Sequence, residues 1–407
     1  MDALIRAAAH ALARGDVLTA LKHVALRDDP SALALRGIVM AQLGELDRAK
    51  SLLDRAAQAF ERQQDALAHA RCVVALAEIA LVSRDLNWPV HALDAACETL
   101  ARKGDLTNAA HARNLAARRW LLIGRMDEAD NRLSSISPAA LPPASRAAYA
   151  LTVAGIAVRR LQIKKAHAAF IQATEWARQA DNPVLSAEIE IAARVLQAPA
   201  ARAITAGQAR EVLLADVQAL RASDALVIDA CRNVLHRRNT RVELGKRPVL
   251  FALIRCLGEA APHDVPRDLL LLRAFRARHT DDSHRARLRV EIGRLRTVIR
   301  PFGQVNATER GFVLVPHAAE RVTVLAPLTD ERNAAILALL ADGEAWSSSA
   351  LAIALDSSPR TVQRALEQLA AAGKAQYFGA GRARRWTVAS VPGFPTTLLL
   401  PDVVPDD

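Results

Sequence analysis

The sequence predicts a mainly α-helical protein, in which an array of helical repeats precedes two small domains of mixed helix and strand. Three observations predict this organisation. Helix-length segments that end at a glycine recur through residues 1–222, short β-prone runs begin only after residue 224, and two later helices are each followed by a hairpin pattern. The 407 residues are 51% hydrophobic, enough apolar material for roughly two to four folded domains.

The turns within residues 1–222 share one form, in which a glycine ends a helix and an acidic residue soon after begins the next. Apolar residues then follow at helical spacing, and small alanines allow close approach of neighbouring helices, so we expect stacked helical pairs. Two segments, Ser134–Ser145 and Gln197–Gly207, are expected to be loops between helices. The glycine turns lie at residues 14–16, 43–49, 103–106 and 123–129.

Two of these turns, Gly44–Ala49 and Gly124–Ala129, fit the pattern G-x-(L/M)-(D/E)-x-A. This pattern resembles the opening of the second helix in tetratricopeptide repeats. The spacing is irregular and the family's Trp and Tyr positions are mostly empty, so the array is a divergent one. The resemblance implies a concave surface for a protein or peptide partner. The alternative is that these helices only scaffold or dimerise the protein.

Positive charge is concentrated in the middle of the chain. The formal net charge is +11, and residues 223–316 hold 18 Lys and Arg against 10 Asp and Glu. Residues 317–407 hold 8 against 10. Such a concentration indicates a polyanionic partner for residues 223–316.

The most basic segment, Ser283–Arg300, has the spacing of a helix with a buried stripe. Leu288, Ile292, Leu295 and Ile299 recur on one face, Ser283 is a plausible N-cap, and Pro301 ends the segment. Such a helix can enter a DNA major groove, because small residues lie outermost and arginines lie on both flanks. A solvated arginine-rich face is the alternative. The arginines are Arg285, Arg287, Arg289, Arg294, Arg296 and Arg300, and the outer strip is Ala286, Val290, Gly293 and Thr297.

The elements around this helix follow a definite order. We expect a β-hairpin from Ala225–Ala230 and Thr240–Leu244, helices over Lys246–Gly258 and Pro266–Phe275, and a polar loop over Arg276–Asp282. The basic helix comes next, and then two strands within Gln304–Val315 around a turn at Thr308–Gly311. This order predicts an α+β domain over residues 223–316.

This domain resembles the OmpR/PhoB-type winged helix-turn-helix. The most specific segments are Ile292–Arg296, Gly311–Leu314 and Leu244–Leu250. The resemblance implies that the basic helix reads the major groove, that Gln304–Val315 forms the wing, and that the loop Arg276–Asp282 contacts RNA polymerase. It also implies DNA contacts by Arg294 and Arg296, with Arg310 at the wing tip. Thr297 and Val298 stand where the family has a basic pair, and Arg285, Arg287, Arg289 and Thr297 are further candidate DNA contacts of this helix. Glu291 departs from the family pattern, as does the lack of a preceding phosphoacceptor domain.

Residues 328–388 repeat this logic. We expect helices over Asp330–Ala341, Ser349–Leu355 and Pro359–Ala372, and a hairpin over Ala375–Val388. The run from Ser358 to Gly373 is similar to the MarR/GntR-like winged helices, so this domain either contacts DNA or only dimerises. The candidate DNA contacts are Arg360, Thr361, Gln363 and Arg364 on the third helix and Arg382, Arg384 and Arg385 on the wing. The tail, residues 389–407, contains four prolines, and its Leu398–Leu400 is expected to dock on a neighbouring domain.

No sequence feature points to an enzyme. Phosphate-binding loops, zinc-protease motifs and nucleophile motifs are absent, and the four cysteines form no CxxC pair. We therefore expect no cofactor and no metal. No membrane segment is expected either, and the protein is expected to be bacterial, cytoplasmic and nucleoid-associated. The favoured hypothesis is a sequence-specific regulator of transcription that binds double-stranded DNA, with a homodimer as a further expectation. The alternative is a protein-interaction adaptor. An RNA-binding regulator is less favoured, because the sequence offers no evident aromatic stacking platform.

Overall fold

The computed structural model describes residues 3–388 except 84, 87, 246, 276–281, 318–320, 329–332, 341–344, 356, 380 and 382–383. Helix accounts for 64% of the described residues, so the prediction of a mainly helical protein is confirmed. The chain forms two compact units. The array unit comprises Met1–Arg160, Lys164–Ala193 and Asn333–Asp407, and the sheet unit comprises Leu161–Ile163 and Arg194–Arg332.

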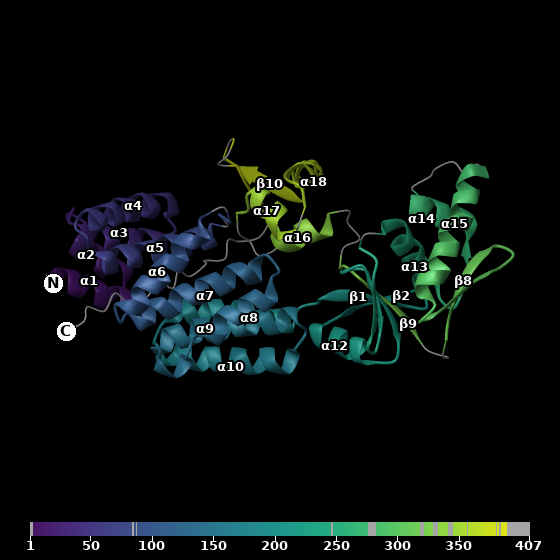
Figure 1. The fold of residues 1–407 in the computed structure, drawn as a ribbon, viewed down its shortest axis with the longest axis horizontal. Helices are drawn as coiled ribbons and strands as arrows, with labels where there is room; N and C mark the ends of the chain where they lie inside the picture. The colour runs from purple at the N-terminus through teal and green to yellow at the C-terminus, as the bar shows by residue number, and fades with distance from the viewer. Residues whose placement is uncertain are drawn as a thin grey trace. The chain divides into compact units, whose positions relative to one another are not determined.

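Helices of the array unit follow one another with short links (Figure 1). Neighbours in sequence, such as α3 and α4 or α6 and α7, pack against each other. Three aspartates accept a hydrogen bond from a backbone N–H in the first turn of the helix that follows them: Asp16, Asp65 and Asp105. The glycine–acid turns predicted this arrangement at Asp16 and Asp105. The helices are α1 (Ala3–Ala13), α2 (Val17–Val24), α3 (Pro30–Gln42), α4 (Leu46–Arg62), α5 (Ala66–Val82), α6 (Val90–Arg102), α7 (Leu106–Leu122), α8 (Met126–Ser134), α9 (Pro143–Arg159), α10 (Ile163–Gln179) and α11 (Pro183–Ala193).

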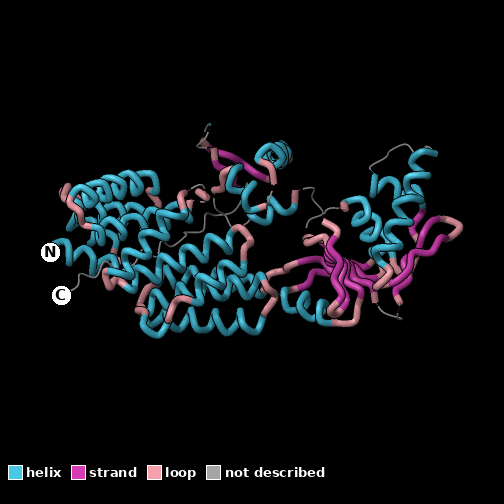
Figure 2. The backbone as a smooth tube through the Cα atoms, in the orientation of Figure 1, coloured by secondary structure: helices cyan, strands magenta, loops and turns pink. Residues whose placement is uncertain are grey.

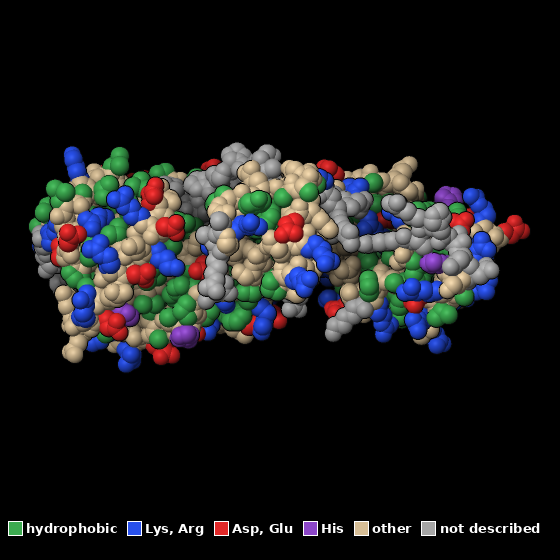
Figure 3. Space-filling model, turned by 90° about the horizontal axis from the view of Figure 1, so that it is seen from above, with side chains coloured by type: hydrophobic (Ala, Val, Ile, Leu, Met, Phe, Trp, Pro, Cys, Tyr) green, Lys and Arg blue, Asp and Glu red, His purple; other side chains and the backbone are tan. Residues whose placement is uncertain are grey.

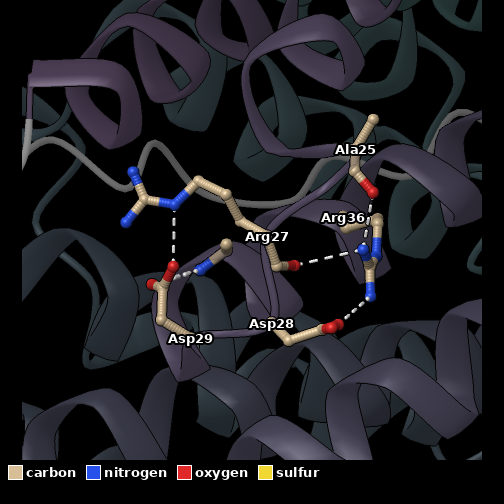
Figure 4. Close-up of polar contacts among 6 residues, drawn as sticks. Ala25, Arg27, Asp28, Asp29 and Arg36 are labelled. Atoms are coloured by element: carbon tan, nitrogen blue, oxygen red, sulfur yellow. Dashed lines mark hydrogen bonds and ion pairs between the residues drawn. The ribbon is translucent and has the colours of Figure 1, made fainter.

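The link between α2 and α3 shows how such a short connection is held (Figure 4). The Arg36 guanidinium donates to the carbonyl oxygens of Ala25 at 2.8 Å and Arg27 at 3.1 Å, and to the Asp28 carboxylate at 3.1 Å. Arg27 in turn donates to Asp29, which caps α3. Carbonyl groups that the end of α2 leaves unpaired are thereby satisfied.

The sheet unit is built on a six-stranded sheet with the order β2-β1-β9-β3-β4-β5 (Figure 2). β9 lies antiparallel to β1 and parallel to β3. Helix α13 packs so closely on this sheet that a Cβ at Gly258 would lie 2.2 Å from Cδ1 of Ile228. The strands are β1 (Ala201–Thr205), β2 (Gln208–Val212), β3 (Leu226–Asp229), β4 (Val234–Arg237), β5 (Thr240–Glu243) and β9 (Val322–Ala326), with α12 (Leu214–Ala222) between β2 and β3.

These strands correct three expectations. The helical array does not continue unbroken to residue 222, because β1 and β2 lie between α11 and α12, and Gln197–Gly207 is not only a loop, because it contains β1. Residues 194–222 belong to the sheet unit. Residues 225–244 form three strands instead of a two-stranded hairpin, because β4 pairs with both β3 and β5. The strand β9 was not predicted at all.

The remaining elements of the sheet unit follow the predicted order. They are α13 (Pro248–Ala260), β6 (Val265–Pro266), α14 (Arg267–Phe275), α15 (Asp282–Ile299), β7 (Gly303–Ala307) and β8 (Gly311–Pro316). The last two form a hairpin, and β6 adds a third strand in the order β6-β8-β7. The expected loop Arg276–Asp282 lies outside the described residues except at its last position.

The C-terminal module contains α16 (Ala334–Leu340), α17 (Ser348–Ala354), α18 (Pro359–Ala371), β10 (Ala375–Phe378) and β11 (Arg385–Val388). Trp346 forms a bridge to Trp386 of β11, and both side chains are fully buried. The module belongs to the array unit, since Leu86 of the array joins its hydrophobic core. The tail 389–407, with Leu398–Leu400, lies outside the described residues.

Candidate nucleic-acid interface

Helix α15 buries the predicted stripe. Leu288, Ile292, Leu295 and Ile299 are all buried, and they belong to the core that also contains residues of α13, α14 and β7. This packing fixes the rotation of the helix, so the residues outside the stripe are held toward solvent. The sequence prediction for this helix is confirmed within one residue at each end.

The five arginines of α15 are exposed, as is Arg300 directly after it, but they differ in their contacts. Arg287 lies over the Phe275 ring, with its guanidinium carbon 4.8 Å from the ring centroid. Arg294 pairs with Glu291 at 2.8 Å, and Arg296 donates from Nε to the carbonyl oxygen of Val305 at 2.8 Å. Arg289 forms no ion pair with any residue that the structure describes. The helix therefore combines anchored arginines with at least one unanchored one.

The strip between the two arginine flanks is open. Val290 is 54% exposed, and nothing lies within 4 Å of a Cβ built at Gly293. Thr297 is exposed, although its hydroxyl donates to the carbonyl oxygen of Gly293 at 3.3 Å. This outer strip can therefore approach another surface closely.

A groove of about 560 Å³ lies beside α15, between its C-terminal half and the start of α13. Arg247, Arg294, Glu291 and Thr297 line it. Helix α13 begins with Pro248 and has no side-chain cap, so its first backbone N–H groups lack a side-chain partner. The groove is therefore lined by two guanidinium groups, of which that of Arg294 is paired with the Glu291 carboxylate, and it adjoins the positive end of the α13 dipole.

The β7–β8 hairpin is fixed to the rest of the sheet unit at its turn. Arg267 donates to the carbonyl oxygens of Glu309 at 2.7 Å and Thr308 at 2.9 Å, and its guanidinium lies over the Phe312 ring. Thr308 donates to Asp264 at 2.7 Å. Arg310, the predicted wing-tip residue, is exposed at this turn.

Sequence reasoning missed Arg267. Its partners lie 41 and 42 residues away, and nothing in the local pattern around Pro266 indicates them. For Arg296 it was the structural contact that was missed. Arg296 was predicted as a DNA contact, and its Nε also helps to hold β7 to α15. Figure 3 shows Lys and Arg side chains at several points in the region of α14, α15 and the hairpin, at the right of the view.

In the C-terminal module, the candidate DNA-contact residues differ in their exposure and in their hydrogen-bond partners. Arg360, Thr361 and Arg364 of α18 are exposed, but the Thr361 hydroxyl lies 2.7 Å from the Ser358 hydroxyl. Gln363 is half-buried and donates to Glu367 at 3.0 Å. Arg384 and Arg385 are half-buried on the hairpin, and Arg382 lies outside the described residues.

The described residues give little support for a metal site or a reactive cysteine. No group of three or more His, Cys, Asp or Glu side chains in the described ranges could hold a metal ion. Burial raises the pKa of Cys72 to about 12 and that of Cys231 to about 11, which is the opposite of an activated thiolate.

Within the described parts of the chain, no helix is both long enough and apolar enough to cross a membrane.

Comparison of the chain with protein-family models, with curated proteins and with solved structures found no match.

Proposed function

We propose that the sheet unit binds double-stranded DNA as a winged helix, with α15 in the major groove and the β7–β8 hairpin against the adjacent backbone. The observation that carries the proposal is the surface of α15. Its apolar stripe is buried while arginines flank an open strip of small residues on both sides. With 18 residues, α15 is about 27 Å long. An α-helix with its side chains is roughly 10–12 Å across, which fits the major groove width of about 12 Å.

The positive charge of the unit supports duplex DNA over a protein partner. Arginines on both flanks of one helix can reach phosphates on the two strands that border a groove, while the outer strip lies near base edges. The anchored arginines would position the protein, and the unanchored Arg289 and Arg310 are free to adapt to DNA. The groove at Arg247 and Arg294 offers a further place for a phosphate.

We propose further that the protein regulates transcription and that the array unit receives the regulatory partner. A pocket of about 160 Å³ lies in the array, lined by apolar side chains that include Leu35, Ile38 and Phe60 and by the polar Arg71 and Asn108. A peptide side chain or small molecule of mixed character suits such a lining. Ala34→Leu should fill this pocket and abolish regulation without changing DNA affinity of the free protein.

The test of DNA binding selects duplexes from a random genomic library with the full-length protein at two salt concentrations. The affinity for the selected duplex is then measured for Arg289→Ala/Arg310→Ala. We expect a loss of about tenfold or more and a shallower salt dependence, because each lost phosphate contact lowers the slope by about one. The matched control is Arg48→Ala/Arg55→Ala, which removes the same charge from exposed positions of α4.

An equal loss in both double variants would mean that only net charge matters. Uniform binding to all duplexes that disappears at higher salt would reduce the proposal to non-specific backbone contacts. Absence of any duplex binding would overturn it and favour the protein-interaction adaptor.

A further inference from the structure

Two neighbouring aromatic side chains on the C-terminal hairpin are unusually exposed. Aromatic residues make up only 4% of the sequence. Among those that the structure describes, only Tyr377 and Phe378 are exposed, at 52% and 54%, and all the others are buried or half-buried. Burial of a large ring is worth on the order of 2 kcal/mol, so each exposed ring is a place where a partner could gain affinity by covering it.

The two rings lie on opposite faces of the β10–β11 hairpin. Tyr377 pairs across the strands with Trp386, and Phe378 pairs with Arg385. Residues directly opposite one another share a face, and successive residues alternate. The Tyr377 ring lies 5.0 Å from that of Trp386, and the Arg384 guanidinium carbon lies 4.6 Å from the Tyr377 ring centroid.

The core of the module does not account for these rings. It is closed by Trp346, Trp386 and residues of α16, α17 and α18, and its contact with the array is made through Leu86, Leu122 and Ile123. Neither Tyr377 nor Phe378 belongs to this hydrophobic cluster. The Tyr377 ring contacts the cluster at Trp386, to which it is tilted by 54°.

The chain segment that carries the rings has charge of one sign. The sequence contains no Asp or Glu between Glu367 and Asp402, whereas Lys374, Arg382, Arg384 and Arg385 lie in this stretch. Arg384 forms no ion pair with the described residues, and its Nε is buried there without a hydrogen-bond partner. Aromatic rings beside guanidinium groups provide both surfaces that a nucleic acid strand needs, one for bases and one for phosphates.

From this geometry we infer that the β10–β11 hairpin binds single-stranded DNA. Unpaired bases stack on Phe378 on one face of the hairpin and on Tyr377 on the other, while the guanidinium groups of Arg384 and Arg385 hold the intervening phosphates. A duplex hides its base faces, so the rings select unpaired bases. The choice of DNA over RNA rests on the proposed function of the sheet unit, which would place an opened strand within reach of the same chain.

The test measures binding of the full-length protein to a labelled oligothymidylate of about twelve nucleotides and to an abasic oligonucleotide of the same length. We expect the abasic strand to bind more weakly although its phosphates are the same. Phe378→Ala should weaken binding to the oligothymidylate by about five- to a hundredfold and leave binding to the abasic strand unchanged. Tyr377→Leu should act likewise, and its thermal unfolding is checked because Tyr377 touches Trp386.

The matched control is Ile353→Ala, which removes another exposed apolar side chain, 41% exposed, from α17 of the same module. Equal binding of the two strands by the unchanged protein would overturn the inference. So would a loss in Ile353→Ala as large as that in Phe378→Ala. Tighter binding of oligouridylate RNA with the same dependence on Phe378 would overturn the assignment to DNA.

The inference and the proposed function fail separately. Arg289→Ala/Arg310→Ala should lose duplex binding and keep single-strand binding. If duplex binding is absent but single-strand binding depends on Phe378, the proposed function of the sheet unit is wrong and the hairpin site stands.

Discussion

At the scale of single residues, the arginines of α15 fall into two roles. The Nε of Arg296 donates a hydrogen bond to the carbonyl oxygen of Val305, so Arg296 joins the helix to β7. We expect Arg296→Ala to lower the free energy of unfolding of the sheet unit by about 1 kcal/mol. Arg289→Ala should leave this free energy unchanged within about 0.5 kcal/mol, because Arg289 forms no ion pair with a described residue. Urea denaturation of both variants checks the difference.

The loss of duplex affinity should depend on which arginine is removed and not only on how many are removed. Arg289→Ala should lower duplex affinity directly, while Arg296→Ala should also loosen the hairpin that carries Arg310. The conservative Arg296→Lys keeps the charge but lacks the Nε donor. If Arg296→Lys were as stable as the unchanged protein, the contact with Val305 would have no structural weight.

His236 of β4 gives the sheet unit a dependence on pH. Burial, and after it the nearby Arg221 guanidinium, lowers the pKa of His236 to about 4. The folded state therefore keeps His236 neutral, whereas the unfolded chain takes up a proton near pH 6.5. Stability falls as the pH falls from about 6.5 toward 4, because the unfolded state binds more protons there.

Between pH 7.5 and 5.5 this one group should lower the free energy of unfolding by about 1 kcal/mol. His236→Gln should lose that part of the pH dependence, although it starts from a lower stability. Urea denaturation of both proteins at the two pH values measures the difference between them. The same slope in both would show that His236 titrates alike in the folded and unfolded states.

At the scale of elements, α15 permits a test that separates stability from recognition. Gly293 lies within the helix on its outer strip, and nothing lies within 4 Å of a Cβ built there. Gly293→Ala should raise the free energy of unfolding by about 0.5 to 1 kcal/mol and leave duplex affinity nearly unchanged. Gly293→Glu should not destabilise the helix, but it should weaken duplex binding strongly, because it places a carboxylate among the phosphates. Equal duplex affinity in the two variants would remove the outer strip from the interface.

Helices and strands differed in how far the sequence could predict them. The bounds of α15 and α18 follow from local signals, since Pro301 ends one and Ser358 and Gly373 delimit the other. The strand β9 has no such signal, because it pairs with β1 and β3, which lie roughly 100 residues or more before it, and nothing in a short window reports a partner at that distance. The strand β1 also pairs locally with β2 around the turn Ala206–Gly207, and the sequence reading missed this hairpin.

The candidate site divides in the same way. The buried stripe and exposed arginines of α15 could be predicted, because helical periodicity is a local property. The contacts that hold the wing could not, because Arg267 and Arg296 reach backbone oxygens of other elements. The exposed pair Tyr377 and Phe378 was hidden as well, since exposure of a ring depends on the packing of the whole module.

At the scale of the whole molecule, the chain has separate cores. Leu53 is fully buried in the core of the array unit, and Leu253 is fully buried in that of the sheet unit. A core that draws its residues from one unit can unfold without the other, so we expect two transitions in thermal or urea unfolding. Leu53→Ala should destabilise one transition by about 2 to 5 kcal/mol, and Leu253→Ala should destabilise the other by a similar amount.

Duplex binding identifies which transition belongs to which unit. The selected duplex should raise the midpoint of the transition that Leu253→Ala lowers and leave the other in place, because a ligand stabilises only the unit that binds it. Oligothymidylate should instead raise the transition that Leu53→Ala lowers, since the β10–β11 hairpin belongs to the array unit. A single transition shifted alike by both leucine variants and both ligands would mean that the units unfold together.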